Sequence, residues 1–199
     1  MKLIVAKDYA AQCKAAADIV EKIVREDPRC CLGLATGSSP VGLYQELARR
    51  CREEGLDFSQ VHSVNLDEYI GLAPEHDQSY RYFMDSNLFD HINIDKKNTY
   101  VAKGVGDVEE NLREFRAVLA KNRVAIQILG VGPDGHIGFN EPGEQLYYSA
   151  HRELLDESTI DANARFFATR EEVPRYAVTM GVGDIMRAER LLTIISAKI

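Results

Sequence analysis

The sequence lacks an excess of basic residues and lacks any apolar run of membrane-spanning length. Its 199 residues carry a formal net charge of −7, so no broad positive field is present to attract nucleic acid or an anionic membrane. A membrane-spanning helix needs about 20 apolar residues in succession, and no stretch approaches that length. We therefore expect no nucleic-acid partner and no membrane partner, and an anionic ligand must be held by a local site.

The sequence also lacks a cysteine spacing typical of metal sites or disulfide frameworks. Its cysteines are Cys13, Cys30, Cys31 and Cys51. This usage favours a reduced compartment, so a cytoplasmic location is expected. The apolar N-terminal run is only strand-length and is followed at once by Lys7 and Asp8, which is not the pattern of a signal peptide.

Segments with the period of strands alternate with segments with the period of helices. Strands are expected at residues 3–6, 30–35, 61–66, 99–102, 124–131, 176–180 and 191–196, and helices at residues 8–26, 40–54, 79–91, 107–122 and 184–188. This alternation predicts an α/β fold with an open, mostly parallel sheet and helices on both faces, in a single domain over residues 1–199. Ligands of such sheets bind beyond the carboxyl ends of the strands, so the residues after each strand are the candidates for function.

A turn of small residues follows the second expected strand. It consists of Thr36, Gly37, Ser38 and Ser39. Backbone N–H groups, hydroxyls and the positive end of a helix dipole suit such a turn to an anion. A simple helix start, with Ser39 as the N-cap and Pro40 as the first helical residue, explains the same residues equally well. The lysine of a Walker A loop and the GxGxxG spacing are absent, which favours a phosphate ester over a nucleotide.

Two carboxylates, Asp67 and Glu68, follow the third expected strand. One of them could serve as a general base, because the end of a strand is where such sheets carry chemistry. An exposed acidic turn is nevertheless the commoner use of an isolated pair. The pair alone therefore favours a surface turn.

A dense polar loop follows the strand expected at residues 124–131. It combines glycines and prolines with Asp134, His136, Asn140 and Glu141. Histidine normally titrates near neutral pH, and neighbouring carboxylates can orient an imidazole, so the composition suits proton transfer. An ordered polar loop on a rigid sheet usually carries function, and we favour that interpretation over a purely structural loop.

The chain resembles the glucosamine-6-phosphate deaminase family in five stretches: LATGSSPVGLY, NLDEYIGL, ILGVGPDGHIGFNEPG, STIDANARFF and YAVTMGVGDIM. The resemblance covers nearly the whole chain. It implies a modified Rossmann fold, no metal or redox cofactor, and conversion of glucosamine 6-phosphate and water to fructose 6-phosphate and ammonia. Two alternatives are a 6-phosphogluconolactonase, in which the DEY turn is not expected, and a sugar-phosphate sensor without turnover.

The resemblance also implies roles for single residues. Asp67 matches the base that moves a proton from C2 to C1 of the opened sugar, and a polar, wet pocket is expected to keep it ionised. His136 matches the residue that opens the ring, and Asp134 and Glu141 match the carboxylates that hold and polarise it. The phosphate-binding residues implied are Thr36, Gly37, Ser38, Ser39 and Arg165, the last suited by its fork of donors.

The end of the sequence departs from the family pattern. Family members continue past the last strand with a phosphate-binding lysine, which would fall just beyond Ile199. The domain is therefore expected to lack the family's C-terminal end, and the role of Lys198 stays open. Residues 151–167 are expected to form either a lid over the sugar or an ordinary surface helix and loop.

Three further expectations concern packing and assembly. Tyr80, Tyr82 and Phe83 are expected to serve in helix packing. The basic residues of allosteric members are matched incompletely by His151 and Arg152, which favours a non-allosteric enzyme. A homo-oligomer is as compatible with the sequence as a monomer.

Overall fold

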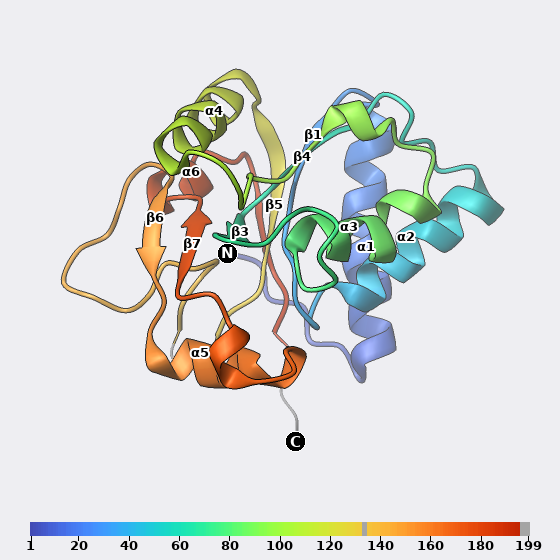
Figure 1. Cartoon of the computed structure of the whole chain (residues 1–199). Helices are drawn as coiled ribbons and strands as arrows, with labels where there is room; N and C mark the ends of the chain where they lie inside the picture. Colours follow the sequence, from blue (N-terminus) through green and yellow to red (C-terminus); the bar gives the residue numbers. More distant parts are fainter. Residues whose placement is uncertain (133–134, 196–199) are drawn as a thin grey trace.

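The computed structural model describes residues 1–132 and 135–195, and its centre is a five-stranded parallel sheet in the order β4-β2-β1-β5-β8. These strands are β1 (Cys31–Leu34), β2 (His62–Asn65), β4 (Thr99–Tyr100), β5 (Val124–Leu129) and β8 (Leu191–Thr193). The helices are α1 (Tyr9–Glu26), α2 (Val41–Glu54), α3 (Tyr80–Asn87), α4 (Val108–Lys121), α5 (Glu157–Asn163) and α6 (Val182–Met186). In Figure 1, α1, α2 and α3 lie on one side of the sheet, and α4 and α6 lie on the other. The predicted open α/β fold is confirmed.

A second, antiparallel sheet stands beside the first, in the order β3-β7-β6. Its strands are β3 (Asp67–Tyr69), β6 (His151–Leu154) and β7 (Tyr176–Thr179). Only Leu66 separates β2 from β3, and its backbone forms hydrogen bonds in two directions. Its N–H donates to the carbonyl of Leu34, and its carbonyl accepts the N–H of Met180. The chain therefore passes directly from the parallel sheet to the antiparallel one, and this junction places Asp67 between them.

Several expected boundaries differ from the structure. Residues 3–6 do not form a strand, and no strand of the described ranges pairs with them; a strand without a neighbour has nowhere to place its backbone hydrogen bonds. The strand expected at residues 176–180 is present, but it runs antiparallel in the second sheet. The helix α2 begins after Pro40, which is its N-cap, so Ser39 does not have the capping role expected of it.

The core lies between the parallel sheet and the helices that cover it. Leu34, Ile126 and Ile128 of the sheet are at most 1% exposed, as are Leu47 of α2 and Phe115 of α4. Burying each such side chain contributes roughly 1.5–3 kcal/mol, which fixes the helices to the sheet. None of the described helices combines the length and apolarity that crossing a membrane requires.

Candidate active site

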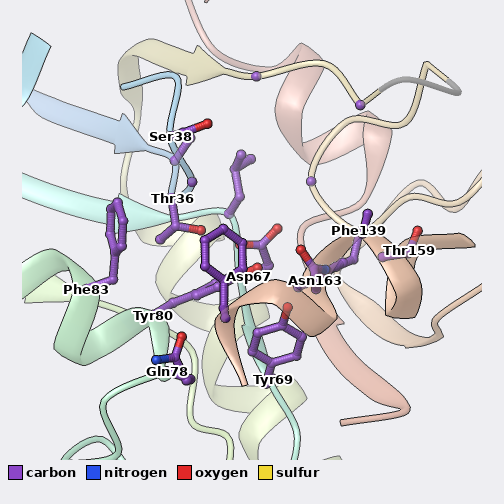
Figure 2. Close-up of a pocket in the computed structure, with 18 of the residues that line it drawn as sticks. Thr36, Ser38, Asp67, Tyr69, Gln78, Tyr80, Phe83, Phe139, Thr159 and Asn163 are labelled. Carbon is purple, nitrogen blue, oxygen red and sulfur yellow. The ribbon is translucent and has the colours of Figure 1, made fainter. Parts of the chain in front are cut away.

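A cavity of about 540 Å³ opens beyond the carboxyl ends of β1 and β5. Its wall contains the small-residue turn (residues 36–39), Asp67, His136 and Arg165, so four of the predicted features meet in one place. Figure 2 shows Thr36 and Ser38 on one side of this cavity and Phe139, Thr159 and Asn163 on the opposite side. Two residues named from the sequence, Asp134 and Lys198, lie outside the described residues.

The small-residue turn follows β1 directly and is anchored at its start by Tyr44. The Tyr44 hydroxyl donates to the carbonyl of Ala35 at 2.6 Å and accepts from the Ala35 N–H at 3.2 Å. Gly37 has a φ of 97°, a conformation that residues with a side chain rarely adopt. Gly37 and Ser38 are exposed to the cavity side of the turn, while α2 begins immediately behind it. The positive end of a helix therefore faces a turn rich in N–H and hydroxyl groups.

Asp67 is buried rather than solvated, with only 5% of its surface exposed. Burial, and to a smaller extent the neighbouring Glu68 carboxyl, raise the pKa of Asp67 to about 8. The polar, wet pocket expected around this residue is not what the structure has. One reason is that aromatic side chains make up part of the surrounding wall.

Six aromatic residues line the cavity, and four of them, which sequence reasoning did not identify as part of the site, form one cluster of ring contacts. These four are Tyr69, Tyr80, Phe139 and Phe167. The ring centroids of Tyr69 and Tyr80 are 5.0 Å apart, and those of Tyr69 and Phe139 are 5.2 Å apart. Tyr80, which was expected to serve in helix packing, does pack against the core and also lines the cavity. One signal was available for Tyr69: it lies two residues after Asp67, and residues so spaced on a strand share a face.

Glu68 points the other way, toward the amino end of α3. Its carboxylate accepts the backbone N–H groups of Tyr69, Tyr80 and Arg81 at 2.9–3.0 Å. Burial raises the pKa of Glu68 to about 7, although these hydrogen bonds oppose the rise. Only 2% of Glu68 is exposed, so the exposed acidic turn favoured for the isolated pair is not present.

His136 packs against the backbone of its own loop. A Cβ added at Gly132 would lie 2.3–2.5 Å from three atoms of the imidazole, so only glycine leaves room for the ring. The Nδ1 atom of His136 is 3.9 Å from a carboxylate oxygen of Glu141, and the two side chains are 22% and 5% exposed. A carboxylate therefore stands beside the imidazole, as predicted for Glu141.

The same loop is packed tightly against Asp67. Gly138 has a φ of 61°, and a Cβ added there would lie 3.2 Å from Asp67 Oδ2 and 3.1 Å from the Thr179 hydroxyl. The next residue, Phe139, donates its N–H to that hydroxyl at 3.1 Å. Because β7, which carries Thr179, pairs with β3, which begins at Asp67, the loop and the carboxylate are held in a fixed relation.

Arg165 reaches the cavity from the segment expected to be a lid or a surface helix. That segment contains β6, α5 and the 3-10 turn Ala164–Phe166. Six of its residues line the cavity: Thr159, Ala162, Asn163, Arg165, Phe166 and Phe167. The guanidinium of Arg165 lies 4.6 Å from the centre of the Phe166 ring, and no carboxylate within the described ranges forms an ion pair with it. Its donors are therefore available to an anion in the cavity. Among the residues the structure describes, no group of three His, Cys, Asp or Glu is placed to hold a metal ion.

Comparison with known proteins points to the same family as the sequence motifs. A family model described as glucosamine-6-phosphate isomerases/6-phosphogluconolactonase matches residues 6–198. A curated glucosamine-6-phosphate deaminase from Clostridium perfringens is 52% identical over 200 residues, covering 100% of this chain and 83% of the relative. Another from Thermoanaerobacter sp. is 48% identical over 200 residues, covering 100% of this chain and 79% of the relative.

Solved structures show the same fold. One described as a monomeric glucosamine-6-phosphate deaminase has a TM-score of 0.94 at 37% identity, covering 97% of this chain and 81% of its own. A 6-phosphogluconolactonase from Thermotoga maritima has a TM-score of 0.71 at 18% identity, covering 96% of this chain and 81% of its own, a likeness of fold alone. The chain therefore belongs to the glucosamine-6-phosphate isomerase/6-phosphogluconolactonase family.

Proposed function

We propose that this chain is a glucosamine-6-phosphate deaminase, which converts glucosamine 6-phosphate and water to fructose 6-phosphate and ammonia. The observation that carries the proposal is that one cavity contains an anion-binding turn, a buried carboxylate at Asp67 and a histidine at His136. The relatives of high identity described above carry the same name. The sugar phosphate is accordingly the small-molecule partner of this site.

The phosphate group is held by the small-residue turn and Arg165. Backbone N–H groups and hydroxyls of residues 36–39 donate to its oxygens, and the guanidinium can bind two oxygens at once. Both lie in the wall of the cavity that also contains Asp67 and His136. Binding the phosphate fixes the far end of the sugar, so binding energy from a group that does not react serves to orient C1 and C2.

Ring opening falls to His136. The imidazole takes the proton of the hydroxyl at C1 and returns a proton to the ring oxygen as the C1–O bond to that oxygen breaks. The Glu141 carboxylate lies 3.9 Å from Nδ1, where it can orient the imidazole for this transfer. Asp134 has the matching role in the family pattern.

Proton transfer between carbons falls to Asp67. Its carboxylate takes the proton from C2 of the open aldehyde while a proton of the substrate's ammonium group moves to the oxygen at C1, which gives an enolamine. Asp67 then delivers its proton to C1, which leaves an iminium group at C2 and a hydroxymethyl group at C1. Water adds to this iminium carbon and ammonia leaves, giving the ketose. An ammonium group of the substrate bound nearby would lower the pKa of Asp67, which burial holds at about 8 in the empty cavity.

A product assay separates this function from its alternatives. The protein is incubated with glucosamine 6-phosphate, and ammonia and fructose 6-phosphate are both measured; equal amounts of the two are expected. Hydrolysis of 6-phosphogluconolactone without either product would support the lactonase, and binding of the sugar without turnover would support a sensor. Asp67→Asn should abolish product formation, whereas Asp90→Asn, at an exposed surface aspartate paired with Lys96, should not.

A further inference from the structure

The hydroxyl of Tyr9 lies against the outer side of the small-residue turn. It is 3.1 Å from the carbonyl oxygen of Ser38 and 3.2 Å from that of Ser39, so its proton is shared between two acceptors. The same oxygen accepts the N–H of Gly42 at 3.0 Å. Tyr9 does not belong to the cavity wall, although Ser38 and Ser39 do. One side chain therefore holds both the turn and the first residues of α2 from behind.

The position of Tyr9 is set by close packing between α1 and α2. Tyr9 is the first residue of α1, whose N-cap Asp8 accepts the N–H of Ala11 at 2.7 Å. A Cβ added at Gly42 would lie 2.5 Å from Cys13 Sγ and 2.9 Å from a Tyr9 ring carbon. Only glycine at this position lets the two helices approach closely enough for the hydroxyl to reach the turn.

These contacts orient a peptide plane of the turn. In a trans peptide the carbonyl and the following N–H point in opposite directions. The carbonyl of Ser38 faces Tyr9, so the N–H of Ser39 points away from Tyr9, and Ser39 itself lines the cavity. No other side chain of the described residues donates a hydrogen bond to these two carbonyls. Removing the tyrosine hydroxyl would therefore leave the Ser38–Ser39 peptide plane free to rotate.

We propose that Tyr9 is a positioning residue for phosphate binding, which acts by fixing the turn so that the Ser39 N–H points into the cavity. The inference rests on the proposed function, because it takes the turn to be the phosphate site. Tyr9 touches no substrate atom in this scheme. Its effect should therefore fall on binding and leave the proton transfers unchanged.

The test compares Tyr9→Phe with Tyr82→Phe. Each change removes one hydroxyl from a half-exposed tyrosine, 43% and 44% exposed respectively, and the hydroxyl of Tyr82 lies outside the cavity wall. We expect Tyr9→Phe to raise the KM for glucosamine 6-phosphate roughly threefold to tenfold, with kcat changed less than about twofold, because a positioned hydrogen bond of this kind is worth about that much. Inorganic phosphate should inhibit competitively, with its inhibition constant raised by the same factor. Tyr82→Phe should change none of these values.

Unchanged KM and unchanged phosphate inhibition in Tyr9→Phe would overturn the inference, as would a loss confined to kcat. Thermal unfolding of the variant is measured as well. A Tyr9→Phe enzyme that is already partly unfolded at the assay temperature would show that its change in KM comes from loss of fold, and this counts against the inference. If phosphate does not compete in the wild type either, the phosphate role of the turn fails as well. Competition in the wild type with no effect of Tyr9→Phe overturns the role of Tyr9 alone.

Discussion

Asp67 and Glu68 are neighbours on β3, but their carboxyl groups lie on opposite faces of the strand. Asp67 faces the cavity, whereas Glu68 accepts three backbone N–H groups around the amino end of α3. Successive residues of a strand point to opposite faces, so a two-residue sequence can place one carboxylate at the substrate and use the other to hold the helix that carries Tyr80. Glu68 also raises the pKa of Asp67 through its charge.

Asp67→Asn should make the protein more stable than the wild type, and this difference should grow as pH rises. The folded pKa of Asp67, about 8, is above the value near 4 of an unfolded aspartate. Stability from this group is fully present below about pH 4 and is lost as pH rises to 8, because ionisation in the buried site costs free energy. The variant should therefore gain several kcal/mol over wild type at pH 8, up to about 5 kcal/mol by linkage across this window, and little at pH 4. Thermal unfolding across this range measures the difference, and a gain independent of pH would contradict the assignment.

The pH dependence of kcat/KM should show an acidic limb near pH 8, because the base must be ionised and burial raises the pKa of Asp67 to about 8. Glu68→Gln removes the neighbouring charge, so the limb should move to lower pH. The variant also weakens the bond to the Arg81 N–H and should cost about 1–3 kcal/mol of stability. A limb that stays in place in a folded Glu68→Gln enzyme would exclude this coupling.

Gly132→Ala should displace His136 without disturbing the fold. The new Cβ would lie 2.3 Å from the nearest atom of the imidazole ring, which is closer than such atoms can approach, so the ring must move. We expect kcat to fall roughly tenfold to a hundredfold, the range of a lost general acid–base contribution. Gly143→Ala is the matched control, because a Cβ there meets only a carbonyl oxygen at 3.9 Å. Wild-type turnover in Gly132→Ala would argue against the role of His136.

Arg165→Ala should act on binding of the phosphorylated sugar. Losing a charge-assisted contact to phosphate should raise KM about tenfold or more, and Arg165→Lys should recover only part of this because lysine lacks the fork geometry. Arg152→Ala is a suitable control, since that guanidinium stacks on Tyr176 at 4.6 Å and lies outside the cavity wall. An equal change in KM in the two alanine variants would show that Arg165 does not bind the phosphate.

The sequence was sufficient for the fold class and the family, because both depend on local patterns. Alternation of strands and helices predicts a parallel sheet, and the junctions after two strands drew attention to the small-residue turn and the loop of His136, both of which line the cavity. The family predicted from the five stretches is confirmed by the match over residues 6–198.

The features that the sequence did not predict depend on contacts between distant parts of the chain. Nothing local in residues 176–180 shows that they pair antiparallel with β3, and nothing local in Asp67 shows that rings from α3 and from the loop at Phe139 bury it. The hydroxyl of Tyr9 lies 29 residues from the carbonyl that it binds. The apolar residues 3–6 show the converse, since their local pattern indicates a strand for which the described structure holds no partner.

The most direct test of the account follows a deuterium atom placed at C2 of glucosamine 6-phosphate. A carboxylate that is 5% exposed should return part of the proton it removes before solvent replaces it. Mass spectrometry of the products should therefore show fructose 6-phosphate with some deuterium at C1, released in equal amount with ammonia, and no product from Asp67→Asn. Failure of the wild type to form ammonia and fructose 6-phosphate, or normal turnover by Asp67→Asn, would contradict the account.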